Sequence, residues 1–198
     1  MPAPISTAAP LILASGSRYR AELLRRLQIP FEAMAADADE SPLSGEAPDA
    51  LSMRLAELKA RAVARLRPDR WILGSDQVCA CGGALLGKPG TRDRAVAQLR
   101  QLSGKTATFY TALTLLHDAS AGFSALDITH VRFRTLQADE IERYVDAESA
   151  LDCAGSFKSE GLGITLCASI DSSDPSGLIG LPLIATRAVL AQAGLALP

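Results

Sequence analysis

The sequence has few of the residues that commonly mark a metal or redox site. Its 198 residues include two histidines, His117 and His130, and aromatic side chains make up 5% of the chain. The four cysteines form no C-x-x-C pair, which argues against a structural zinc site. We therefore expect reduced, buried thiols and two histidines with structural roles.

Long apolar runs and a strong excess of charge are also missing. No apolar run approaches the roughly 20 residues of a membrane span, and the first 14 residues lack the basic segment of a secretory signal. We therefore expect a cytoplasmic protein without a membrane partner. The net charge of −2 argues against a broad basic surface for duplex nucleic acid. Only four of the 20 basic residues are lysines: Lys59, Lys88, Lys105 and Lys158.

The hydrophobic pattern predicts an α/β protein with a mixed sheet. An apolar fraction of 48% and a charged fraction of 21% are typical of a globular chain. Residues 1–9 are predicted to be a flexible lead, and residues 10–198 a single domain. Strands are predicted at 11–14, 71–74, 107–116, 125–134 and 161–170, and helices at about 19–27, 49–66, 91–102, 137–147 and 181–194. Residues 35–50 and 171–180 are predicted loops, and 82–90 a hairpin or loop.

Polar side chains follow the predicted strands, which is where α/β proteins usually place a site. Ser15 and Arg20 come after the first strand, Asp76 directly follows strand 71–74, and Lys88 lies in a Gly-x-Pro turn. Cationic groups suit phosphates, and a carboxylate there suits a divalent metal or a general base. Each signal is weak by itself, because an aspartate in that position is often only a turn or cap residue.

Several segments together resemble the Maf family of nucleoside triphosphate pyrophosphatases, in order along residues 10–192. One departure is Arg18, where the family often has proline. The segments are 11–20 (LILASGSRYR), 22–24 (ELL), 37–40 (DADE), 55–60 (LAELKA), 74–78 (GSDQV), 87–89 (GKP), 153–161 (CAGSFKSEG) and 180–183 (GLPL).

The resemblance implies a fold and a reaction. The expected fold is a mixed β-sheet flanked by helices, similar to inosine triphosphatase, with two lobes and a cleft. The expected reaction is hydrolysis between the α and β phosphates of a nucleotide, with a divalent cation, Mg²⁺ or Mn²⁺. By the same resemblance, Asp76 is the catalytic residue, acting as proton acceptor or chiefly as a metal ligand together with Glu40. The residues expected to bind phosphates are Ser15, Arg20, Lys59 and Lys88.

Three positions bear on which nucleotide is used. Tyr19, Gln77 and Glu160 resemble the branch of the family that hydrolyses 7-methyl-GTP, whereas the dTTP and UTP branch typically carries Arg, Thr and Gln there. A methylated purine is cationic, so an aromatic ring and a carboxylate both favour it. The alternatives are a dTTP or UTP pyrophosphatase and a nucleotide-binding regulator of cell division. The small-molecule nucleotide is the expected partner, and a homodimer is plausible by resemblance.

Overall fold

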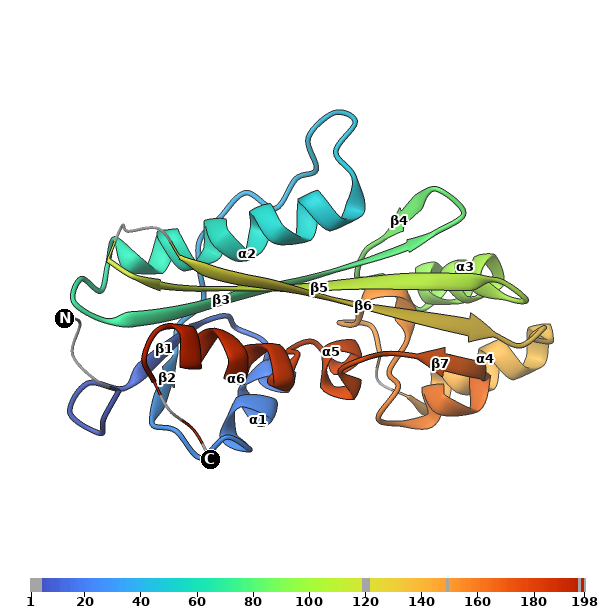
Figure 1. The fold of residues 1–198 in the computed structure, drawn as a ribbon. Helices are drawn as coiled ribbons and strands as arrows, with labels where there is room; N and C mark the ends of the chain where they lie inside the picture. The colour runs from blue at the N-terminus through green and yellow to red at the C-terminus, as the bar shows by residue number, and fades with distance from the viewer. Residues whose placement is uncertain (1–4, 119–121, 149, 196, 198) are drawn as a thin grey trace. The chain divides into compact units, whose positions relative to one another are not determined.

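A mixed β-sheet with helices on its faces forms the centre of the fold, which confirms the predicted class (Figure 1). The computed structural model describes residues 5–118, 122–148, 150–195 and 197. The first four residues of the predicted flexible lead therefore lie outside the described residues. The strand order is β2-β1-β3-β5-β6-β7, with β4 paired to β3. Strand β1 pairs in parallel with β2 and β3, whereas the β3–β4 and β6–β7 pairs are antiparallel.

The chain forms two compact units, and three strands contribute to both. Unit 1 contains the residues up to Asp76, Thr111–Asp127 and the residues from Asp174 onward, and unit 2 contains Gln77–Tyr110 and Ile128–Ser173. The shared strands are β3 (Trp71–Cys81), β5 (Thr106–His117) and β6 (Phe123–Phe133). The other elements of unit 1 are β1 (Leu11–Ala14), α1 (Arg18–Arg25), β2 (Phe31–Ala33), α2 (Pro48–Ala64), α5 (Pro175–Ile179) and α6 (Leu183–Gln192).

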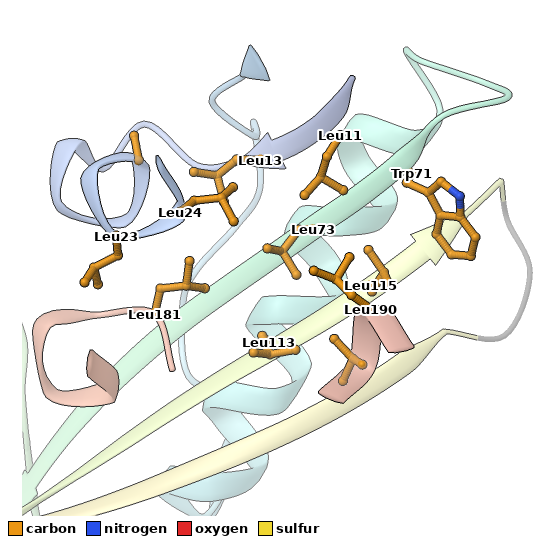
Figure 2. Packing of buried hydrophobic residues seen from close by; sticks show 12 residues of the cluster. Leu11, Leu13, Leu23, Leu24, Trp71, Leu73, Leu113, Leu115, Leu181 and Leu190 are labelled. Atoms are coloured by element: carbon orange, nitrogen blue, oxygen red, sulfur yellow. The ribbon is translucent and has the colours of Figure 1, made fainter. Parts of the chain in front are cut away.

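Unit 1 buries both faces of β1, which explains the continuous apolar run of this strand. Leu11 and Leu13 of β1 point into a cluster with α1 and α6, shown in Figure 2. Ile12 and Ala14 point to the opposite face, where they pack against α2. Each side chain of this short strand is therefore buried. At about 25 cal/mol per Å² of apolar area, such burial is the main stabilising contribution to the unit.

Helix α2 approaches β3 very closely at Gly74. A Cβ atom placed on Gly74 would lie 2.1 Å from the Ala56 carbonyl oxygen and 2.8 Å from the Ala60 Cβ. Only glycine leaves room for the helix backbone at this point of the strand. Because of this close approach, Lys59 of α2 lies beside β3. There it contacts Asp76, which is two residues after Gly74 in the sequence.

Unit 2 is built around an aromatic core. Phe157 packs against Phe109 and Phe133, with ring centroids 6.0 and 5.1 Å apart. Burial raises the pKa of the nearby Cys79 thiol to about 12, and all four cysteines are free. Cys79 and Cys81 are buried as expected, whereas Cys153 and Cys167 are half-buried. The elements within unit 2 are β4 (Ala84–Leu86), α3 (Arg92–Leu102), α4 (Ala138–Ala147), the 3-10 turns η1 (Ala154–Ser156) and η2 (Leu162–Leu166), and β7 (Cys167–Asp171).

Three predictions about the elements were wrong. Strand β3 extends to Cys81, so Asp76 lies inside it, because β4 pairs with the strand beyond the end of β1. The first half of the predicted strand 161–170 is η2, since the backbone folds back onto the Lys158 carbonyl at Gly163. The predicted loop 171–180 contains α5, whose N-cap, Asp174, accepts a hydrogen bond from the Ser176 N–H.

Other elements agree with the sequence pattern. The helices α1, α2, α3, α4 and α6 and the strands β1, β5 and β6 match their predicted ranges to within two residues. Residues 82–90 were predicted to form a hairpin or a loop, and the pairing of β4 with β3 confirms the hairpin. Strand β2 was not predicted. In the part of the chain that the structure describes, no helix is both long and apolar enough to cross a membrane.

Candidate functional site

The turn between β1 and α1 forms the first part of the candidate site. The Ser17 side chain caps α1 by accepting from the Arg20 N–H at 3.4 Å. The Ser15 hydroxyl accepts from the Ser17 N–H at 3.1 Å. These bonds fix a serine hydroxyl at the N-terminal end of a helix of eight residues, where an anion is favoured.

Arg20 joins this turn to the segment of unit 1 that contains Gly180. Its Nη1 donates to Ser15 Oγ at 3.3 Å, and its Nε donates to the Gly180 carbonyl oxygen at 2.9 Å. The Ser75 hydroxyl of β3 donates to the same carbonyl oxygen at 3.3 Å. Burial lowers the pKa of Arg20, and the negative charges of Asp76 and Glu40 oppose that shift. Arg20 nevertheless stays a cation at neutral pH.

Lys59 forms the centre of a second group with two carboxylates. Its Nζ lies 2.6 Å from Asp76 Oδ1 and 2.8 Å from Glu40 Oε1. The side chains of Lys59 and Asp76 are 9% and 8% exposed, whereas that of Glu40 is 56% exposed. Lys59, which was expected to bind phosphate, is ion-paired with these two acids in this structure. A buried carboxylate is thereby paired with the same ammonium group as a solvent-accessible one.

Glu40 and Asp76 fit the divalent cation that the family resemblance implies. Two carboxylate oxygens converge on one cationic atom, the Lys59 nitrogen. Mg²⁺ is typically bound by one or two carboxylates, with phosphate oxygens and water completing its shell. Among the described residues no group of three or more His, Cys, Asp or Glu side chains is placed to hold a metal by itself. The donor set therefore suits a cation shared with a bound phosphate.

Lys88 lies in unit 2, exposed on a loop that is fixed by hydrogen bonds. The Gly87 carbonyl oxygen accepts from Gln98 Nε2 at 3.0 Å and from the Gly155 N–H at 3.3 Å. The Gly90 N–H donates to the Leu151 carbonyl oxygen at 3.0 Å. The loop thus presents the Lys88 ammonium to solvent from a defined backbone.

The three positions expected to select the base lie in both units. Tyr19 of α1, in unit 1, is half-buried, and the Arg18 guanidinium lies 4.8 Å from its ring centroid and donates to its hydroxyl at 2.8 Å. Gln77 of β3 and Glu160 belong to unit 2, where Gln77 is half-buried and Glu160 is exposed. Arg18 is the first residue of α1, a position that also accepts proline.

The structure brings together the phosphate and carboxylate residues predicted in unit 1. Sequence reasoning missed the roles of the Gly180 carbonyl and Ser75, although both lie in the quoted segments 180–183 and 74–78. The two histidines contact other residues of the fold: His117 lies edge-on to Trp71, with centroids 5.1 Å apart, and His130 Nδ1 is 3.1 Å from Thr108 Oγ1.

Comparison with known sequences identifies the family. The model of the Maf-like protein family matches residues 10–193. The chain belongs to the Maf family. This Maf protein is 55% identical over 188 residues to a 7-methyl-GTP pyrophosphatase of Xanthomonas oryzae pv. oryzae (strain MAFF 311018), covering 95% of this chain and 98% of that protein. It is 54% identical to a 7-methyl-GTP pyrophosphatase of a Polaromonas species (strain JS666), covering 96% and 88%.

Solved structures with weaker similarity include two Ham1 proteins. The Ham1 protein of Staphylococcus aureus aligns with a TM-score of 0.47 at 11% identity, over 63% of this Maf chain and 72% of that chain. A HAM1 protein from Coxiella burnetii aligns with a TM-score of 0.46 at 15% identity, over 79% and 97%.

Proposed function

We propose that this Maf protein is a nucleoside triphosphate pyrophosphatase that converts 7-methyl-GTP to 7-methyl-GMP and pyrophosphate. Such an activity would keep the modified nucleotide out of nucleic acid. The observation that carries the chemistry is the buried Asp76, ion-paired with Lys59 next to Glu40. The substrate is suggested by the names of the relatives and by Tyr19, Gln77 and Glu160.

In the proposed reaction, water attacks the α-phosphorus and pyrophosphate leaves. Asp76 accepts a proton from the attacking water, because its carboxylate is held in one orientation by Lys59. Lys59 orients that carboxylate and takes no part in bond breaking. A divalent cation held by Glu40 and Asp76 would supply charge stabilisation at the phosphate and a more acidic water.

Cationic and hydroxyl groups would neutralise the triphosphate. Arg20 is already oriented by Ser15 and Gly180, so little side-chain entropy is lost when it pairs with a phosphate. The Ser15 oxygen accepts two hydrogen bonds, and its own O–H is the group that would donate to a phosphate oxygen. Lys88 would add a further positive charge.

Base selection would depend on charge as well as shape. The Tyr19 ring would stack on the cationic purine, a contact typically worth about 0.5–2 kcal/mol. Glu160 would accept hydrogen bonds from the guanine edge and complement the positive charge of the base. Gln77 would supply an amide that can both donate and accept.

Pyrophosphate release from a nucleotide panel tests this proposal. The panel contains 7-methyl-GTP, GTP, dTTP, UTP and CTP, with Mg²⁺ or Mn²⁺. We expect 7-methyl-GTP to have the highest kcat/KM, and Glu160→Gln to reduce it more than it reduces the values for neutral bases. Faster turnover of dTTP or UTP would contradict the substrate, and binding without turnover would favour a regulatory role.

A further inference from the structure

Glu148 contacts two sides of the segment that carries Glu160. It follows α4 directly, as the C-cap residue. Its Oε1 lies 3.0 Å from Lys158 Nζ, and its Oε2 accepts from the Leu162 N–H at 2.8 Å. The side chain of Glu148 is 11% exposed and that of Lys158 is 21% exposed. Charge-assisted hydrogen bonds of this kind are stronger than neutral ones and gain from low exposure. We call residues 158–162 the Glu160 loop.

Two further contacts hold the start of the Glu160 loop. The Lys158 N–H donates to the Tyr144 hydroxyl at 3.2 Å. Burial raises the pKa of Tyr144, so its hydroxyl stays protonated at neutral pH. Phe157, one residue earlier, is anchored between the rings of Phe109 and Phe133. The loop therefore leaves the core of unit 2 at a fixed point.

The Glu160 loop folds tightly against the Glu148 carboxylate. A Cβ atom on Gly161 would lie 2.0 Å from Glu148 Oε2, and one on Gly163 would lie 2.3 Å from the Lys158 carbonyl oxygen. The two glycines permit a backbone approach that no other residue would allow without displacement. Glu160 itself is exposed, between the two anchored residues Lys158 and Leu162.

We infer that Glu148 is a positioning residue for base recognition, which it supports by fixing the Glu160 loop from both sides. The inference rests on the proposed function, in which Glu160 accepts hydrogen bonds from the base. Glu148 also holds the Lys158 ammonium, which is two residues from Glu160 in the chain.

Glu148→Ala and Glu148→Gln test the inference, with Asp139→Asn as a matched control. Asp139 lies on the same helix α4, and its exposed carboxylate pairs with Arg143. For Glu148→Ala we expect the preference for 7-methyl-GTP over GTP to fall about tenfold, chiefly through KM. Glu148→Gln retains an acceptor for the Leu162 N–H, so its loss should be smaller. Asp139→Asn should keep the wild-type preference.

Hydrogen exchange supplies a readout that does not depend on turnover. The amides of Lys158 and Leu162 should exchange faster in Glu148→Ala, whereas the amides of the core strand β5 should stay protected. Unchanged exchange of these two amides in a folded variant would overturn the inference. If Glu148→Ala does not fold, Glu148→Gln carries both measurements.

A double-mutant cycle separates failure of the inference from failure of the proposed function. If Glu148 acts through Glu160, adding Glu148→Ala to Glu160→Gln should cause little further loss of preference. If Glu160→Gln lowers the preference and Glu148→Ala does not, the role of Glu148 is wrong and the proposed function stands. If Glu160→Gln changes nothing, recognition by Glu160 fails, and the positioning role fails with it.

Discussion

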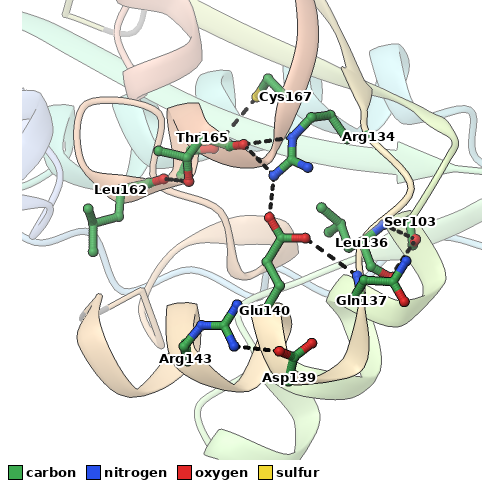
Figure 3. A network of polar contacts seen from close by, with 11 residues as sticks. Ser103, Arg134, Leu136, Gln137, Asp139, Glu140, Arg143, Leu162, Thr165 and Cys167 are labelled. Atoms are coloured by element: carbon green, nitrogen blue, oxygen red, sulfur yellow. Dashed lines mark hydrogen bonds and ion pairs between the residues drawn. The ribbon is translucent and has the colours of Figure 1, made fainter.

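The two units contain ion pairs of nearly equal length and very different exposure. In unit 1, Lys59 Nζ lies 2.6 Å from Asp76 Oδ1, with side chains 9% and 8% exposed. In unit 2, Arg143 Nη1 lies 2.5 Å from Asp139 Oδ2, with side chains 69% and 73% exposed (Figure 3). Exposed pairs contribute little to stability, whereas removing one partner of a buried pair leaves a costly uncompensated charge. Bond length alone therefore says little about importance.

The pair of Arg134 and Glu140 in unit 2 is intermediate in solvent exposure between these two pairs. Arg134 donates to the Glu140 carboxylate and to the Thr165 carbonyl oxygen, while Glu140 accepts from the Gln137 N–H at 3.4 Å (Figure 3). The network links the residue that follows β6 with η2 and the start of α4. Its function is to hold these elements together, in contrast to the Lys59 group, which contains the proposed reactive carboxylate.

The largest expected effect comes from the buried pair. Asp76→Asn removes the proton acceptor and one partner of Lys59, so we expect pyrophosphate release to fall by about 10²–10⁴-fold. The measurement is kcat with saturating 7-methyl-GTP, and Asp139→Asn is the control for loss of an ion-paired aspartate. Full activity of Asp76→Asn would show that Asp76 is not the catalytic residue.

Gly74→Ala tests whether the close approach of α2 to β3 is required. The added methyl group would lie 2.1 Å from the Ala56 carbonyl oxygen, so α2 must move, and Lys59 moves with it. We expect a loss of about 1–3 kcal/mol in the free energy of unfolding, measured with urea, together with reduced activity. Gly87→Ala is the matched control for stability, because nothing lies within 4 Å of its added Cβ.

The ion pair between Glu46 and Arg54 should make the stability of unit 1 depend on pH. Arg54 Nε and Nη2 donate to the two Glu46 oxygens at 2.6 and 2.8 Å, which lowers the pKa of Glu46 from its usual 4.5 to about 2. A lowered pKa in the folded state means that the stabilisation is complete above pH 4.5 and is lost as pH falls towards 2. We expect the urea-unfolding midpoint of Glu46→Gln to depend less on pH between these two values than that of the wild type. A pH dependence identical to that of the wild type would contradict this assignment.

The smallest effect is expected from the exposed pair of unit 2. Arg143→Gln should change the free energy of unfolding by less than about 1 kcal/mol, because the Arg143–Asp139 pair is solvated in both states. Thermal unfolding of the variant and the wild type measures this difference. A loss clearly above about 1 kcal/mol would contradict the expectation that an exposed pair contributes little to stability.

The sequence predicted the elements whose apolar spacing is set by local packing. It failed where pairing or packing with another segment decides the structure, as for β3, which continues past Gly74 and pairs with β4. Lys59 could be assigned to the site from its motif, but its pairing with Asp76 depends on how α2 packs against β3. Glu148 was missed for the same reason, since its partners Lys158 and Leu162 lie 10 and 14 residues away.

The different exposures of Lys59 and Lys88 make the two lysines respond differently to salt. Mobile ions screen charges at the surface within a Debye length of about 8 Å at physiological ionic strength, and they reach buried pairs far less. Any attraction of the exposed Lys88 for a nucleotide therefore weakens as salt is added. The Lys59–Asp76 pair, shielded from solvent, keeps its geometry under the same conditions. Added salt should therefore weaken the binding of a polyanion by Lys88 and leave the orientation of the Asp76 carboxylate unchanged.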